Sequence, residues 1–273
     1  MTDGKAIQIS LLAIRVGVMI VFMAWTLDKI VNAAHFNATL EMYYHTTLPS
    51  TVLLVVGVLE LLLLLVFFFF NRYKTITYGF VLAAHILTTL VSSWRLFPPF
   101  EKHMLLHYAT LPTLAGLILL FWLREKDTLL KFESAPVVDN VINEERNTKI
   151  ALLFIRLSVA AVFLAWTSNK IFFAERSVTM MSNYYFFPFT PNILLILGIL
   201  EIGLVLVFLS GKFRNWTYAI ILIGHTASTL VSSPRFFPPY EFHALLYLGA
   251  FSMLGACIAL YLMRDQDTFF TLK

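Results

Sequence analysis

The sequence has few charged residues, few glycines and a single cysteine. Asp, Glu, Lys and Arg make up 13% of its 273 residues, whereas an ordinary soluble domain carries about 25%. This scarcity excludes a free-standing soluble globule, and a net charge of +4 points to basic loops beside a membrane rather than to nucleic acid. The lone Cys257 excludes an intramolecular disulfide, a CxxC redox pair and a cysteine zinc cluster. The 11 glycines form no phosphate-binding loop, and neither a Ser-His-Asp order nor an HExxH motif is present.

Apolar residues dominate the composition of the sequence. They make up 59% of the chain, with a mean hydropathy of +0.79, enough for about eight membrane-spanning helices of roughly 20 residues each. The apolar runs lie at 7–27, 50–70, 76–93, 104–123, 150–168, 192–210, 216–233 and 243–263. The first run contains Arg15 and lacks a small-residue cleavage site, so we interpret it as a permanent helix rather than a signal peptide. The sequence therefore predicts an all-α polytopic membrane protein of eight helices.

The two halves of the chain repeat one another. The segment at 85–106 matches the segment at 225–246 in 14 of 22 positions, HILTTLVSSWRLFPPFEKHMLL against HTASTLVSSPRFFPPYEFHALL. The only linker-like stretch separates the halves. We therefore expect a four-helix repeat at 1–125, a polar cytoplasmic linker at 126–149 and a second four-helix repeat at 150–273. An even number of spans per unit makes the repeats parallel.

Charge predicts the orientation. With the N-terminus inside, twelve Lys and Arg residues lie on the cytoplasmic side of the predicted spans and six on the opposite side. The positive-inside rule then places both termini in the cytoplasm.

A few strongly polar residues fall at membrane depth, and each occurs in both halves. A charge there costs about 2.5–3.5 kcal/mol on insertion scales, so it normally faces protein or a water-filled cavity. The pairs are Arg15 and Arg156, Glu60 and Glu201, and His85 and His225. We expect each arginine to neutralise a glutamate and the histidine and glutamate to handle protons. The same groups also suit a static polar contact between helices, and the sequence leaves both interpretations open.

A second polar cluster follows the third helix of each unit. Tandem prolines stiffen this turn because they cannot continue a helix. Its repeated polar residues are Arg95 and Arg235, Glu101 and Glu241, and His103 and His243. We interpret it either as a rigid interfacial turn or as the rim of a ligand site, with the two histidines as candidate metal ligands.

Aromatic residues and unpaired histidines complete the candidates. Trp25 and Trp166 are expected to anchor the interface or, alternatively, to stack on a flat ligand ring. His35, His45 and His107 have no histidine at the corresponding place in the second half. We interpret them as surface or loop residues, or as signs that the two halves have diverged.

Short motifs in both halves resemble the DoxX-like superfamily of four-helix membrane proteins. The first helix carries Arg15–Phe22–Lys29 and Arg156–Phe163–Lys170, and the second carries a Gly-x-x-Glu element at Gly57–Glu60 and Gly198–Glu201. The resemblance implies a small prokaryotic protein of the cytoplasmic (inner) membrane, linked to respiratory or sulfur redox chemistry and often quinone-facing. Lys29 and Lys170 join the candidate cofactor-binding residues on this basis.

Three classes of function fit these observations. In the first, the protein is a quinone-interacting membrane subunit of an oxidoreductase, or a haem protein in which His85 and His225 are axial ligands. In the second, it is a transporter for a small solute or metal ion. In the third, it is a non-catalytic assembly partner whose polar residues only join helices. Because little polar mass lies outside the bilayer, we expect electrons or substrate to arrive from a partner subunit or a diffusible carrier.

Overall fold

The computed structural model describes residues 3–96, 104–132, 144–236 and 244–272. All regular structure in these residues is helical, which confirms the predicted all-α class. The longer helices are α1 (Asp3–Val31), α3 (Ser50–Phe69), α4 (Lys74–Val91), α6 (Thr110–Trp122), α7 (Glu144–Phe172), α9 (Pro191–Ser210), α10 (Arg214–Ser232) and α12 (Gly249–Leu262). The short helices are α2 (Ala33–Tyr44), α5 (Met104–His107), α8 (Ala174–Tyr185) and α11 (Ala244–Tyr247), with 3₁₀ turns η1 (Ser93–Leu96), η2 (Arg124–Lys126) and η3 (Ser233–Phe236).

Seven helices in the described part of the chain are long and apolar enough to cross a membrane. They are Gly4–Val31, Ser50–Phe69, Lys74–Val91, Leu105–Trp122, Glu144–Phe172, Pro191–Ser210 and Leu245–Leu262. These helices indicate a protein that lies in a lipid bilayer. The eighth predicted segment, 216–233, forms α10, but residues such as Arg214, Asn215 and His225 make it less apolar than the seven.

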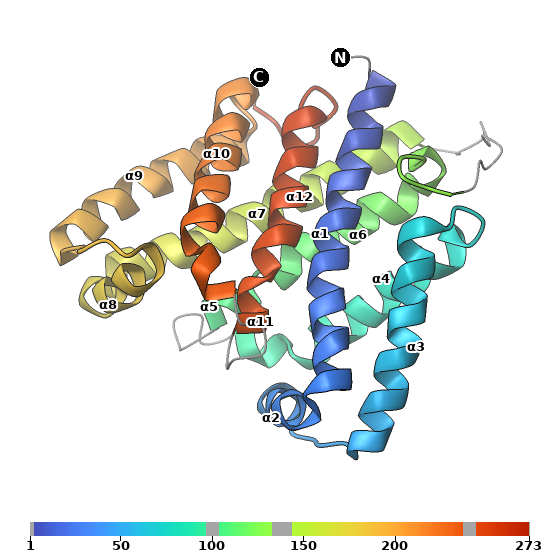
Figure 1. Ribbon diagram of the computed structural model, residues 1–273. Helices are drawn as coiled ribbons and strands as arrows, with labels where there is room; N and C mark the ends of the chain where they lie inside the picture. The colour runs from blue at the N-terminus through green and yellow to red at the C-terminus, as the bar shows by residue number, and fades with distance from the viewer. Residues whose placement is uncertain (1–2, 97–103, 133–143, 237–243, 273) are drawn as a thin grey trace.

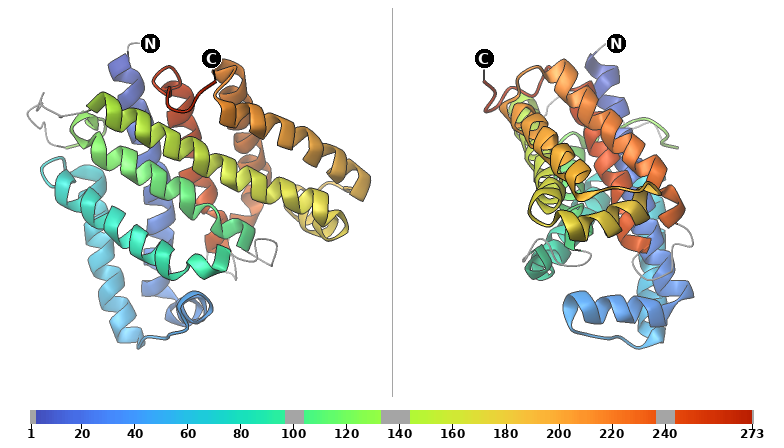
Figure 2. Two further views of the ribbon diagram at one scale, coloured as in Figure 1. Left: turned by 180° about the vertical axis from the view of Figure 1, so that it is seen from behind. Right: turned by 90° about the vertical axis from the view of Figure 1, so that its left-hand side faces the viewer.

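Two helices that the hydropathy pattern does not predict, α2 and α8, follow α1 and α7. Asn32 caps the start of α2, where its side-chain oxygen accepts from the His35 backbone N–H, and His45 ends it in the left-handed conformation. Phe186 ends α8 in the same way. Figure 2 shows α2 lying across the end of α1 that is remote from the chain termini. α2 thus packs against α1 and α3, and α8 packs in the same way against α7 and α9.

The two halves pack crosswise. The first helix of each half packs against the last helix of the other half, α1 against α12 and α7 against α6. Figure 1 shows α1 and α12 side by side in front of α7 and α6. Equivalent contacts occur within each half, since α1 packs on α3 as α7 packs on α9. The shared core contains Leu11 and Ile14 of α1, Leu152 and Ile155 of α7, and Leu260 of α12.

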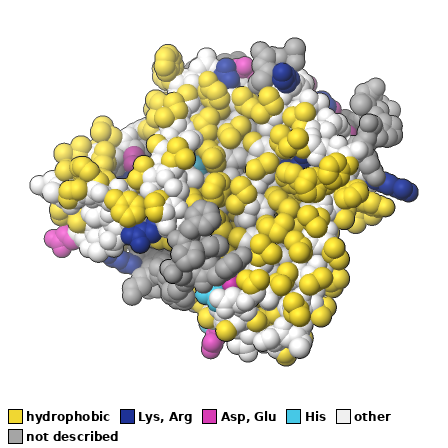
Figure 3. Space-filling model, in the orientation of Figure 1, with side chains coloured by type: hydrophobic (Ala, Val, Ile, Leu, Met, Phe, Trp, Pro, Cys, Tyr) yellow, Lys and Arg dark blue, Asp and Glu magenta, His cyan; other side chains and the backbone are white. Residues whose placement is uncertain are grey.

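Large apolar side chains cover the outside of α3 and α9. Leu59 is 61% exposed and Leu200 is 66% exposed. Figure 3 shows apolar side chains spread over one face of the molecule, with few charged groups among them. In water such a surface would favour aggregation, whereas acyl chains of a bilayer cover it without cost.

Two glycines allow the close contact between α1 and α12. A Cβ on Gly17 would lie 2.4 Å from the Phe251 carbonyl oxygen, and one on Gly255 would lie 2.6 Å from the Ala13 carbonyl oxygen. Small residues commonly permit this approach between membrane helices.

We therefore expect Gly17→Ala and Gly255→Ala each to destabilise the protein by about 1–3 kcal/mol, because backbone must move to admit the methyl group. The control is Gly203→Ala in α9, where a Cβ meets nothing within 4 Å. Unfolding in mixed detergent micelles measures the difference. If Gly17→Ala is as stable as Gly203→Ala, the close helix contact is wrong.

Candidate functional site

The arginine of α1 is fully buried in an ion pair. Arg15 Nη1 lies 2.8 Å from Asp127 Oδ2, and neither side chain is exposed. Tyr78 donates its hydroxyl to the same carboxylate oxygen, and Arg15 also donates to the Leu129 carbonyl. These additional hydrogen bonds matter because a buried ion pair offsets its desolvation only when further partners satisfy it.

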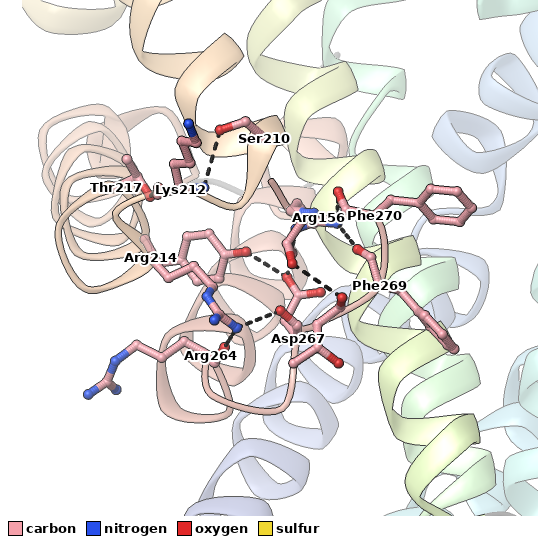
Figure 4. Close-up of polar contacts among 12 residues, drawn as sticks. Arg156, Ser210, Lys212, Arg214, Thr217, Arg264, Asp267, Phe269 and Phe270 are labelled. Carbon is pink, nitrogen blue, oxygen red and sulfur yellow. Dashed lines mark hydrogen bonds and ion pairs between the residues drawn. The ribbon is translucent and has the colours of Figure 1, made fainter. Parts of the chain in front are cut away.

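The second half contains the equivalent contacts. Arg156 Nη1 lies 3.4 Å from Asp267 Oδ2, and the Tyr218 hydroxyl donates to that oxygen over 2.6 Å. Figure 4 shows Arg156 reaching from α7 toward Asp267 and the carbonyls of Phe269 and Phe270. Burial raises the pKa of the Asp267 carboxyl, and the Tyr218 hydrogen bond and the charge of Arg156 partly offset that rise. We call the two groups, Arg15 with Asp127 and Tyr78 and Arg156 with Asp267 and Tyr218, the arginine clasps.

The expected pairing of the arginines with the glutamates is therefore wrong. Each arginine pairs instead with an aspartate that follows the last helix of its own half. Sequence reasoning missed Asp127 and Asp267, although the dipeptides Asp127-Thr128 and Asp267-Thr268 recur at the same 140-residue spacing as the other repeated motifs.

In the described part of the chain, a lysine contacts the first clasp only. Lys131 donates to the Phe67 carbonyl over 3.0 Å and to the Tyr78 hydroxyl over 2.8 Å, whereas Thr271 stands at the corresponding place in the second half. Burial, together with the charge of Arg15, lowers the pKa of Lys131 to about 7.

This lowered pKa predicts a pH-dependent stability. A lysine in the unfolded chain holds its proton to about pH 10, so between pH 7 and pH 10 unfolding takes up a proton and stability rises with pH. We expect Lys131→Thr to reduce that slope. Chemical unfolding of both proteins from pH 6 to pH 10 measures it, and parallel profiles would contradict the prediction.

A second ion pair joins the last turn of α1 to α3. Lys29 Nζ contacts Glu60 Oε2, and the Thr26 hydroxyl donates to the same oxygen over 3.1 Å. In the second half Lys170 Nζ lies 2.5 Å from Glu201 Oε1, and Thr167 donates to Glu201 over 2.8 Å. The predicted glutamates and lysines are thus brought together in both halves.

The glycine of the Gly-x-x-Glu element is needed for close packing between helices. A Cβ on Gly57 would lie 2.7 Å from Ile30 Cγ1, and one on Gly198 would lie 2.7 Å from Ile171 Cγ1. Each glycine lets the second long helix of its half approach the end of the first. The glutamate one turn further along then meets the lysine.

Each Lys–Glu pair lines a cavity. The first cavity has a volume of about 390 Å³, and Trp25, Lys29, Glu60 and His85 line it together with many apolar residues. The second cavity has a volume of about 460 Å³, and Trp166, Lys170, Glu201 and His225 line it. Both tryptophans, expected at the interface or beside a ligand ring, thus line the cavities. Leu106, Ala109 and Leu246 line both cavities, which places the two side by side.

The histidines in the cavities hydrogen-bond to backbone. His85 Nε2 lies 3.1 Å from the Thr110 carbonyl oxygen, and His225 Nε2 lies 3.0 Å from the Ala250 carbonyl oxygen. Because a carbonyl only accepts, Nε2 carries the proton in each ring. In the neutral imidazole Nδ1 is then a hydrogen-bond acceptor.

This arrangement does not fit a haem held between the two histidines. His85 and His225 line different cavities, and the Nε2 atom of each is engaged with a carbonyl. Within the described ranges, no three His, Cys, Asp or Glu side chains come close enough to hold a metal ion. The candidate metal ligands His103 and His243 lie outside the described residues, as do Glu101 and Glu241.

Of the two arginines that precede the Pro-Pro turns, the structure describes the side chain of Arg235 only. Arg235 donates to the Asn183 carbonyl over 2.8 Å and so ties η3 to the end of α8. Arg95 lies in η1, and its side chain is outside the described part of the structure.

Two histidines without a counterpart occupy buried or paired positions, which corrects their interpretation as surface residues. His107 is buried, lines the first cavity and lies 3.1 Å from Ser92 Oγ through Nε2. His35 Nδ1 lies 2.8 Å from the buried Asp28 Oδ2. At the corresponding places the second half has Tyr247 and Arg176, so the two halves differ chemically.

Comparison with known proteins gives no relative: no family model, no curated protein and no solved structure matches this chain.

The Lys29–Glu60 pair gives a quantitative test. Glu60 is 34% exposed, so its contribution lies below the 3–5 kcal/mol of a fully buried pair. We expect a coupling free energy of about 1–2 kcal/mol from the cycle of Lys29→Met, Glu60→Gln and the double variant. Detergent unfolding measures it, and the Lys170–Glu201 cycle is the matched comparison. Additive single effects would show that the pair contributes nothing.

Proposed function

We propose that the protein binds a lipid-soluble quinone in its cavities and serves as the quinone-facing membrane subunit of a respiratory or oxidoreductase system. The observation that carries this proposal is an apolar, aromatic-lined cavity containing a Lys–Glu pair and a histidine acceptor, present once in each half. Ligand cavities typically combine a predominantly apolar wall with a few placed polar groups.

The side chains suit the chemistry of such a ligand. When bound, a quinone supplies carbonyl oxygens that take up two electrons and two protons. Lys29 offers a charged hydrogen-bond donor to a carbonyl oxygen, and Glu60 beside it is a carboxylate that can hold or release a proton. His85 Nδ1 can accept a hydrogen bond from a hydroxyl.

The membrane arrangement belongs to the same proposal. We place eight membrane helices in two parallel four-helix repeats in the prokaryotic inner membrane, with both termini in the cytoplasm. The crosswise packing of α1 on α12 and α7 on α6 supports the repeat. The beginning of α1 and the chain after α12 lie at the same end of the molecule (Figure 1), as an even number of spans requires. We further propose that the protein is related to the DoxX-like proteins that its short motifs resemble. A partner subunit then delivers the electrons.

Tryptophan fluorescence tests quinone binding directly. We expect a short-tailed 1,4-benzoquinone to quench the purified protein saturably, because Trp25 and Trp166 line the cavities. Trp25→Phe and Trp166→Phe should each remove part of the quenching, while Trp216→Phe, which removes a 74% exposed ring, should leave the saturable part unchanged.

The lysine provides the specificity control. Lys29→Met should weaken binding in the first cavity about tenfold or more, as expected for a lost charge-assisted hydrogen bond. Quenching that does not saturate, or that persists in a protein lacking both cavity tryptophans, would contradict the proposed function.

A further inference from the structure

Two hydroxyl groups in the first cavity lack hydrogen-bond partners. Thr89 and Thr110 both line this cavity, and the Oγ1 atom of each is buried without a partner. Thr89 is 8% exposed as a residue. Most buried polar groups in proteins are hydrogen-bonded, so each exception needs an explanation.

The residues at the two corresponding positions of the second cavity have no unpartnered hydroxyl. Thr229, which corresponds to Thr89, donates to the His225 carbonyl over 2.8 Å. Ala250 stands where the first half has Thr110. Among the described residues that line the second cavity, no buried side-chain polar atom is left without a partner. The unpartnered hydroxyls are thus a property of the first cavity.

These hydroxyls come from different helices than the Lys–Glu pair does. Lys29 and Glu60 belong to α1 and α3, whereas Thr89 belongs to α4 and Thr110 begins α6. Polar side chains of α10 in the second half, such as Ser228 and Thr229, line the second cavity in the same way. The two cavities therefore differ in the partners of these groups: two hydroxyls of the first cavity are left without one, and among the described residues of the second cavity none is.

We propose that the first cavity selects a ligand with oxygen atoms at both ends of its ring, one at Lys29–Glu60 and the other at Thr89 and Thr110. This inference rests on the proposed function and narrows it. A 1,4-quinone has two carbonyl oxygens on opposite sides of the ring, so it presents an acceptor to each set of donors. The second cavity, which lacks the unpartnered hydroxyls, holds the quinone at one end only and therefore binds it more weakly.

The test removes both hydroxyls: valine keeps the shape at position 89, and alanine at position 110 reproduces Ala250 of the second half. In Thr89→Val combined with Thr110→Ala, the affinity for a short-tailed 1,4-benzoquinone, read from the Trp25-dependent quenching, should fall at least about tenfold, since two hydrogen bonds are lost. The affinity for a phenol with the same tail, read from its displacement of the quinone, should change less than about twofold. The reciprocal Ala250→Thr should strengthen the Trp166-dependent binding of the quinone several-fold.

Controls separate ligand contacts from stability. The lost hydroxyls have no protein partner, so the double variant should be at least as resistant to unfolding as the original protein, and Thr89→Val alone is the milder alternative. Thr229→Val, which removes the bond to the His225 carbonyl, should lower stability and leave Trp25-dependent binding unchanged.

The outcomes are distinct. If the double variant binds the quinone as tightly as the original protein, the hydroxyls serve only trapped water and the inference is overturned, while the proposed function stands. If the original protein shows no Trp25-dependent quenching at all, the proposed function fails and this inference fails with it.

Discussion

Charged groups that enter a bilayer must find partners inside the protein, and the rest of this structure follows from that constraint. Without water to solvate them, the arginine of the first helix and the lysine at its end each need a carboxylate nearby. The chain meets this need at two levels. Arg15, near the middle of α1, is paired through the arginine clasp, and Lys29, in the last turn of α1, is paired with Glu60. The Lys–Glu pair lines a cavity, so the pairing that permits insertion also furnishes the candidate site.

Much of the fold could be predicted because the signals are local. Long apolar runs and their repetition predict the long helices and their equivalence, whereas the short helices α2 and α8 contain too many polar residues to stand out. The pairing of Arg15 could not be predicted in the same way. Its partner Asp127 lies 112 positions away, beyond the last apolar run of the half, and hydropathy says nothing about which carboxylate an arginine meets. Glu60 and Lys29, by contrast, both recur in the second half, and the structure brings them together in each half.

The candidate site shows the same division. The repeated residues His85, Glu60 and Trp25 were recognised from the sequence, and all three line the first cavity. Thr110 does not stand out in the sequence, because a threonine that does not recur at the matching position carries no signal, and His107 stands out only as a difference between the halves. Their importance appears only when the helices are packed. Repetition thus reveals the shared scaffold, while the differences between the halves carry the chemistry that distinguishes one cavity from the other.

An experimental density map of the protein, extracted from its native membrane into lipid nanodiscs without added ligand, tests most directly whether the paired polar groups surround space that a ligand fills. We expect non-protein density of ring-like shape in the first cavity, in contact with Lys29 and bounded by Trp25 and His85. A map in which Glu60 and His85 face the surrounding lipid, with protein side chains filling the space between the helices, would contradict it.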